Sequence, residues 1–246
     1  MKVIKILTML VFIVISNEFE LFCNDSIALL NKNIGIMKLK NNAYLMKSSF
    51  ALNGNLDCNH LLIIDKTDVV LVNTPVNDSI TKIMFACIEQ KFKKKVTKVI
   101  ASHFHEDSSG GLLEAKKQET TTYGLNLTQE KLKNKGIKFD IIFIDSLKIM
   151  LSSESTIELY YFGAGHSVDN IVVWLPNEKI LFGGCLLKSL STNSRGNTND
   201  ADIVKWPLTV MKVKKRFNTA TIVIPGHADI GDNKIFDHTI KIFNTN

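Results

Sequence analysis

The chain has 246 residues, of which 45% are hydrophobic and 22% are charged, and its formal net charge is +6. This length can bury one sizeable core, and the hydrophobic fraction excludes a disordered polymer. The lysines stand in short runs without the interleaved aromatic residues that nucleic-acid stacking requires, so we expect no nucleic-acid partner and only a mild attraction for small anions.

The N-terminus has the pattern of a secretory signal peptide. A basic start precedes an almost wholly apolar run from Ile6 to Ile15, which is too short to span a membrane. The alternative is a buried N-terminal helix or strand. We expect residues 1–22 to be a signal peptide whose cleavage site the sequence does not define. Residues 23–246 are then expected to form a single domain that works in the periplasm.

Apolar periodicity and turn residues predict the elements of the first half. Lys66-Thr67-Asp68 should form a tight hairpin turn, and Asp78 and Thr128 are the expected helix N-caps. We expect strands at 34–39, 43–48, 60–65, 69–72, 96–101 and 120–123, a loop over 49–59, and helices over 78–91, after 110–111 and over 128–136.

The second half repeats this order of strands followed by helices. A helix should begin at Trp206-Pro207, because proline is tolerated in the first turn, and should reach about residue 217. A last helix is expected over 233–243, and strands are expected at 139–143, 156–161, 171–174, 180–182 and 221–224. The order predicts an α/β fold of two packed sheets with helices outside both.

The four cysteines do not form a disulfide framework in a chain of this size. Cys58 falls in a polar loop, whereas Cys87 falls in an apolar helical stretch where a buried structural thiol is expected. Cys185 differs from these because it follows two glycines and joins a set of possible metal ligands.

The most informative run is His103-Phe104-His105-Glu106-Asp107. Two histidines separated by one residue project to the same side of an extended segment, so both can reach one zinc ion. Further downstream stand three more possible ligands, each next to a glycine: His166, Cys185 and His227. Six ligands suffice for two divalent metals with places left for water, which indicates metal-assisted hydrolysis.

The ligand-bearing segments all fall at the ends of expected strands, so we expect them to gather at one edge of the fold. His60 and His238 lack any such context, and structural or solvent-facing roles are expected for both.

These motifs resemble those of the class B, zinc-dependent β-lactamases, in the subclass that uses a cysteine ligand. The resemblance runs from about residue 34 to the C-terminus and rests on residues 103–111, 165–176, 183–189, 196–201 and 225–227. It implies an αββα four-layer sandwich with its site in a groove along the sheet edge. It also implies hydrolysis of the lactam amide of penicillins, cephalosporins and carbapenems, and hence antibiotic resistance.

The resemblance further implies a role for each site residue. Lys188 would bind the carboxylate of a small β-lactam substrate, and Asn197 would help to polarise the lactam carbonyl. Asp107 and Asn197 are the expected catalytic residues, Asp200 is expected to support the site, and the protein is expected to be a monomer. Two zinc ions are implied, the first held by His103, His105 and His166 and the second by Asp107, Cys185 and His227.

Three positions depart from the family pattern. Asn73 and Val76 stand where the family usually has Asp and often Trp, and Ser108 replaces a frequent Arg or Cys. We expect these changes to affect metal affinity and substrate preference rather than the reaction class. The loop carrying Phe50, Leu52 and Leu56 should close over the substrate, unless these side chains pack inward as a small core.

Two other functions are alternatives for a chain with these zinc-ligand motifs. A glyoxalase-II-like thioesterase typically shows His-x-His-x-Asp-His and a bridging Asp, whereas this chain has Ser108 after Asp107 and has Cys185 at the bridging position. A secreted protein that binds zinc without catalysis would hold the metal tightly and show no turnover.

Overall fold

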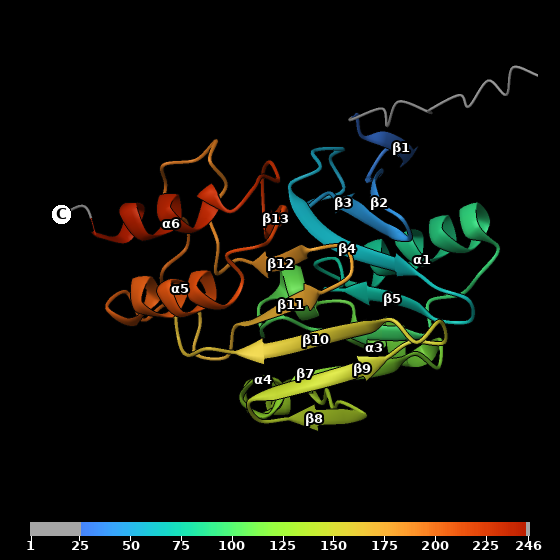
Figure 1. The fold of residues 1–246 in the computed structure, drawn as a ribbon. Helices are drawn as coiled ribbons and strands as arrows, with labels where there is room; N and C mark the ends of the chain where they lie inside the picture. The colour runs from blue at the N-terminus through green and yellow to red at the C-terminus, as the bar shows by residue number, and fades with distance from the viewer. Residues whose placement is uncertain (1–25, 245–246) are drawn as a thin grey trace, which may run out of the picture.

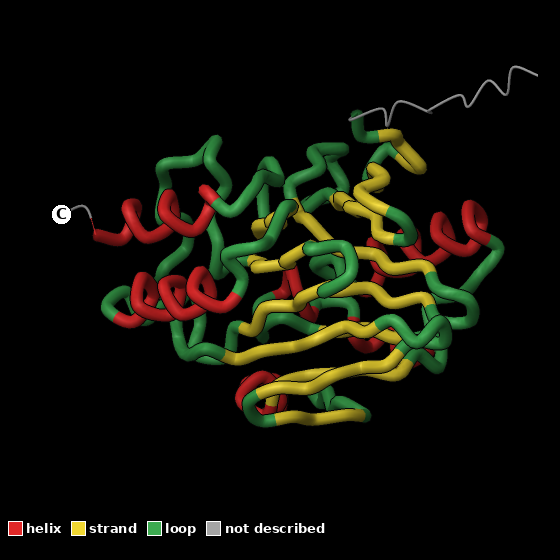
Figure 2. The backbone as a smooth tube through the Cα atoms, in the orientation of Figure 1, coloured by secondary structure: helices red, strands yellow, loops and turns green. Residues whose placement is uncertain are grey.

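The computed structural model describes residues 26–244, so the expected signal peptide lies outside the described residues. Two β-sheets face each other, and helices cover their outer sides (Figures 1 and 2). The eight-stranded sheet runs in chain order through β1 (Ala28–Asn31), β2 (Ile34–Lys40), β3 (Ala43–Ser48), β4 (Cys58–Ile64), β5 (Val69–Val72), β6 (Lys98–Ile100), β7 (Thr121–Leu125) and β8 (Ile141–Phe143).

The second sheet has five strands in the order β13 (Ile222–Pro225), β12 (Ile180–Gly184), β11 (Ile171–Leu175), β10 (Thr156–Tyr161) and β9 (Ser146–Met150). The helices are α1 (Asp78–Phe92), α2 (Glu106–Ser109), α3 (Leu112–Lys117), α4 (Asn126–Leu132) with the 3₁₀ turn η1 (Lys133–Lys135), α5 (Lys205–Arg216) and α6 (Lys234–Asn244). Within this described part of the chain, no helix has the length and apolarity that crossing a bilayer requires.

Strand alternation explains why the sheets bury both faces. In β5, Val70 and Val72 point into the core between the two sheets, whereas Val69 and Leu71 point outward toward α1. Successive side chains of a strand face opposite sides, so an all-apolar strand contributes to two cores at once. The hydrophobic runs of the sequence therefore specify strands that are covered on both faces.

Helices complete the two outer cores. Ile80 and Met84 of α1 pack on the outer face of the larger sheet, and Trp206 of α5 and Phe236 of α6 pack on the outer face of the smaller one. The order of layers is helix, sheet, sheet, helix (Figure 1), which confirms the expected αββα sandwich.

Several expected boundaries are wrong for identifiable reasons. The N-cap of α1 is Asn77, whose side chain accepts the amide of Ile80, rather than Asp78. Both residues are good capping types, and only Asn77 has the extended backbone that a cap requires. Likewise, Thr128 does not cap α4. The helix begins at Asn126, and Thr128 is a buried residue of its first turn.

The structure also adds elements that the periodicity did not indicate. β1 and β9 lie at sheet edges, where few side chains are buried and an apolar pattern is not required. α2 is a single turn, which is too short to show a helical period. Cys58 is a buried first residue of β4, not part of a polar loop, and Cys87 is only half-buried.

Candidate metal centre

All six expected ligands lie at one end of the sandwich, where strands of both sheets finish. His103 and His105 follow β6, Asp107 lies in the single turn of α2, and His166 lies between β10 and β11. Cys185 and His227 follow the neighbouring parallel strands β12 and β13. Because parallel strands end at the same edge, residues far apart in the chain meet there.

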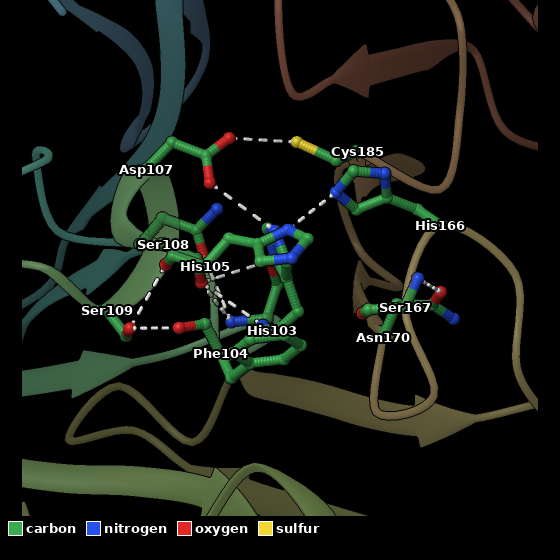
Figure 3. Close-up of polar contacts among 12 residues, drawn as sticks. His103, Phe104, His105, Asp107, Ser108, Ser109, His166, Ser167, Asn170 and Cys185 are labelled. Atoms are coloured by element: carbon green, nitrogen blue, oxygen red, sulfur yellow. Dashed lines mark hydrogen bonds and ion pairs between the residues drawn. The ribbon is translucent and has the colours of Figure 1, made fainter. Parts of the chain in front are cut away.

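Asp107, Cys185 and His227 form one compact group. Asp107 Oδ2 lies 3.0 Å from Cys185 Sγ and 3.0 Å from His227 Nε2, and Cys185 Sγ lies 3.5 Å from His227 Nε2. Asp107 and Cys185 point toward each other across the site (Figure 3). A carboxylate, a thiol and an imidazole at this spacing could bind one ion together.

Three histidines converge beside this group. The ring centroids of His103, His105 and His166 lie 4.8–5.0 Å apart in every pairing, and His105 Nδ1 lies 2.9 Å from His166 Nε2 (Figure 3). His103 also lies within ligand range of Asp107 and of Cys185. The geometry therefore brings the six ligands together but leaves their division between two ions as a proposal.

The donor atoms fit bound zinc. The Nε2 atom of His103 is buried without a hydrogen bond and lies 3.4 Å from Asp107 Oδ1, so a cation bound between these two atoms would satisfy both. Imidazole nitrogen, thiolate sulfur and carboxylate oxygen are the atoms that zinc prefers in proteins.

The titration of these groups reflects burial and their close spacing. Burial and the neighbouring Asp107 carboxylate raise the pKa of the Cys185 thiol well above its usual range. Burial by itself would raise the pKa of Asp107, but His103 and His227 hold it well below its ordinary value. Burial and the two neighbouring histidines lower the pKa of His166 to about 2, so this imidazole is neutral and free to act as a ligand.

Residues behind the ligands fix their orientation. His105 Nε2 lies 3.0 Å from Asp200 Oδ2, which leaves its Nδ1 atom facing the centre. His227 Nδ1 lies 3.2 Å from the carbonyl oxygen of Asp57. Such contacts select the tautomer of a ligating histidine, so the structure gives Asp200 the supporting position expected for it.

Gly226 allows Cys185 to approach His227. A Cβ atom added at Gly226 would lie 2.4 Å from Cys185 Sγ and 2.8 Å from its backbone nitrogen. Any larger residue would push the two strand ends apart. The glycine beside the ligand in the sequence is thus explained by close packing.

A cavity of about 470 Å³ opens over the ligands. Lys188 lies on its wall, with Nζ 5.1 Å from the Trp206 ring centroid, and burial lowers the pKa of its ammonium group. Asn197 is exposed on the same wall. The cavity is lined further by Phe50, Phe104, Glu106, Lys135 and Gly196.

Of these lining residues, Phe104 and Glu106 alternate with the ligands, so the motif itself could have indicated them. Lys135, in contrast, comes from η1, and no local signal in the sequence marks it.

Both expected arrangements occur among the side chains of the loop over 49–59: some line the cavity or face solvent, and one packs inward. Phe50 lines the cavity and is 52% exposed, and Leu52 is 44% exposed. Leu56 instead packs inward close to Gly35. The loop therefore has one anchored side chain (Leu56), one that lines the cavity (Phe50) and one that is exposed outside the cavity (Leu52).

The three positions that depart from the family pattern, Asn73, Val76 and Ser108, lie in different surroundings. Val76 is buried in the outer core with α1 and does not line the cavity. Asn73 and Ser108 form a hydrogen bond beneath the ligands. Of the histidines set aside as structural, His60 is fully buried and His238 contacts the carbonyl oxygen of Thr192.

Comparison with known proteins adds to this geometry. A family model described as the ODP family beta lactamase matches residues 56–220. A metallo-beta-lactamase type 2 of Bacteroides fragilis is 36% identical over 239 residues, which span 95% of each chain. One from Bacillus cereus is 35% identical over 210 residues, spanning 85% of this chain and 82% of its own. A solved metallo-beta-lactamase from Pontibacter korlensis matches with a TM-score of 0.81 at 28% identity, covering 87% of this chain and 100% of that one.

Proposed function

Since this chain belongs to the metallo-β-lactamase family, we propose that it is a zinc-dependent hydrolase that opens the four-membered lactam amide of penicillins, cephalosporins and carbapenems. The observation that carries this proposal is the convergence of six ligand side chains beneath a cavity that also contains Lys188 and Asn197. Such an enzyme would confer resistance to these antibiotics.

We propose that His103, His105 and His166 hold a first zinc ion and that Asp107, Cys185 and His227 hold a second. The compactness of the second group and the mutual approach of the three imidazoles support this division. When bound, the two ions would supply Lewis acidity that activates water and stabilises charge on the lactam carbonyl and nitrogen.

The remaining residues would bind and orient the substrate. Lys188 would pair with the substrate carboxylate, which lies beside the lactam nitrogen in bicyclic β-lactams. Its partial burial supports this role, because an ion pair is stronger where water is scarce. The Asn197 amide would donate to the lactam oxygen as negative charge develops there, and Phe50 would cover the bound molecule with apolar surface.

One assay separates this proposal from its rivals. A chromogenic cephalosporin and a glutathione thioester are each incubated with the protein, with and without a chelator. We expect chelator-sensitive cleavage of the cephalosporin and little of the thioester. Cleavage of the thioester alone would indicate a thioesterase, and tight zinc binding without turnover would indicate a non-catalytic protein. No acyl-enzyme is required, so an inactivator directed at serine should have little effect, whereas full activity in the zinc-free protein would refute the proposal.

We also propose that the mature protein is a periplasmic monomer. The basic start and apolar run at the N-terminus support secretion through a signal peptide. Expression with an epitope at the C-terminus, followed by cell fractionation and N-terminal sequencing, tests both the compartment and the cleavage site.

A further inference from the structure

A continuous chain of hydrogen bonds runs beneath the metal ligands through His60, Asn73 and Ser108. The Ser108 hydroxyl donates to Asn73 Oδ1 at 2.7 Å, and His60 Nδ1 lies 3.2 Å from the backbone carbonyl oxygen of Asn73. All three residues are at most 2% exposed, so water cannot replace these contacts. They come from β4, from the end of β5 and from α2, which no local sequence pattern connects.

At one end, these hydrogen bonds reach the segment 103–107, which carries three of the ligands. The backbone N–H of Ser102 donates to both Asn73 Oδ1 and Ser108 Oγ, at 2.9 and 2.8 Å, and the N–H of His103 lies 3.2 Å from Ser108 Oγ. Ser108 itself follows Asp107 directly, and Figure 3 shows it beside the ligands. The same two side chains thus fix the backbone where His103 begins and where Asp107 ends.

At the other end, both ring nitrogens of His60 take part in hydrogen bonds. A carbonyl oxygen can only accept a hydrogen bond, so His60 Nδ1 carries the proton and Nε2 accepts from the Ser48 hydroxyl at 2.8 Å. The imidazole is therefore neutral and fixed at both nitrogens. Asn73 has a positive φ of 65°, a conformation that asparagine tolerates better than most residues.

We propose that His60, Asn73 and Ser108 act together as a positioning unit for the metal-binding segment, and above all for Asp107 in the second site. The unit carries no net charge, and it acts on Asp107 through the hydrogen bonds of the adjacent residue Ser108. Removing one member leaves buried polar groups of the others unpaired, which costs more than a single hydrogen bond. This inference rests on the proposed two-metal site.

Asn73 and Ser108, which both depart from the family pattern, depend on each other in this unit. Asn73 supplies the acceptor that the Ser108 hydroxyl needs, and Ser108 supplies a donor short enough to reach it. Changes to groups that support metal ligands commonly weaken metal binding by about 10–100-fold. We therefore expect the effects of Asn73 and Ser108 on metal affinity at the second site to be coupled.

Cobalt titration tests this directly, because the absorption band of a cobalt–thiolate bond reports ligation by Cys185 and hence occupancy of the second site. Ser108→Ala removes one hydroxyl, and Asn73→Gly removes the side chain while keeping a residue that accepts positive φ. Each should weaken cobalt binding at the thiolate site by roughly tenfold or more. Asn73→Asp, which keeps the acceptor oxygen, should bind at least as tightly as the wild type.

Three further variants sharpen the result. The loss in the double variant Asn73→Gly/Ser108→Ala should differ from the sum of the two single losses, because each single variant leaves the Ser102 N–H one acceptor and the double variant leaves it neither. His60→Phe, which keeps the ring and removes its hydrogen bonds, should weaken binding by at least about threefold. Thr120→Val is the control, because it removes a buried hydroxyl that donates to the carbonyl oxygen of Val96, and these two residues precede β7 and β6, at the opposite end of these strands from the ligands.

The outcomes are distinguishable. A wild-type protein without a cobalt–thiolate band would refute the proposed second site rather than this unit. If that band is present, wild-type affinity in Ser108→Ala, additive losses in the double variant or an equal loss in Thr120→Val would each overturn the positioning role. Should Asn73→Gly not fold, Ser108→Ala alone decides, because it deletes a single atom.

Discussion

Cys185 Sγ and Asp107 Oδ2 lie 3.0 Å apart although 78 positions separate the two residues in the chain. In the absence of a cation the thiol donates to the carboxylate, and burial together with this contact keeps the pKa of the thiol high. A bound metal would reverse the situation, because coordination removes the thiol proton. Metal binding would therefore replace the proton shared by this pair with a cation.

Replacing Cys185 by serine should empty or weaken the second metal site. A hydroxyl is a poor substitute for a soft, charged thiolate, so we expect kcat/KM to fall by roughly 100-fold, the upper end of the range seen for support residues. Elemental analysis after dialysis should find one zinc in place of two, while circular dichroism stays unchanged. Cys87→Ser, in a half-buried position of α1, is the matched control. Two tightly held zinc ions with normal turnover in Cys185→Ser would refute the assignment.

Charge reversal at Lys188 should act mainly on KM. Attraction to the substrate carboxylate operates in both the ground state and the transition state, so Lys188→Glu should raise KM by about 10–100-fold, the value of a charged hydrogen bond. Added salt should also raise KM of the wild type. Lys215→Glu on the exposed face of α5 changes net charge equally and should leave KM unaltered. An unchanged KM for every carboxylate-bearing substrate in Lys188→Glu would contradict this role.

Phe50 should contribute to binding of large substrates only. Its ring is half-exposed and lines the cavity, so Phe50→Ala removes about 1 kcal/mol of apolar contact and should raise KM roughly fivefold for β-lactams with bulky side chains. Small substrates and the melting temperature should change little. Leu52→Ala in the same loop is the control, since Leu52 is exposed but does not line the cavity. Equal effects of both variants would argue for loop stability instead.

The metal-free protein should lose stability in mild acid because of His60. Burial lowers the pKa of His60 to about 4, against 6.5 for the exposed side chain. Between these values the unfolded chain binds a proton that the folded protein does not, so stability falls as pH decreases through this window. From pH 7 to pH 5 the loss from this group should be about 2 kcal/mol.

Urea unfolding at both pH values, in the presence of a chelator, measures this loss. His60→Gln should lose less stability over the interval than the wild type, whatever its absolute stability. His238→Gln, which alters a half-buried histidine of α6 that contacts the carbonyl oxygen of Thr192, is measured alongside as the variant that lacks a different histidine. Parallel losses in wild type and His60→Gln would show that His60 does not titrate as expected.

Local pattern accounted for most of the fold. The alternation in Thr156–Tyr161 predicted β10 at both ends, because this inner strand must match a core on one face. The edge strand β9 was missed because its residues are mostly exposed and burial leaves little trace in them. The choice between Asn77 and Asp78 as N-cap depended on backbone angles, which two equally suitable residue types cannot reveal.

The chemistry of the site can be predicted from short segments, because the ligand types, their spacing and their position at strand ends are all local properties of the chain. The way in which these segments meet depends on sheet packing. The bond between Asn73 and Ser108 spans 35 positions, and it exists because β5 and β6 lie side by side and end together. His60, featureless in the sequence, became a support for the site for the same reason: contacts between distant residues are created by sheet packing, which no local pattern records.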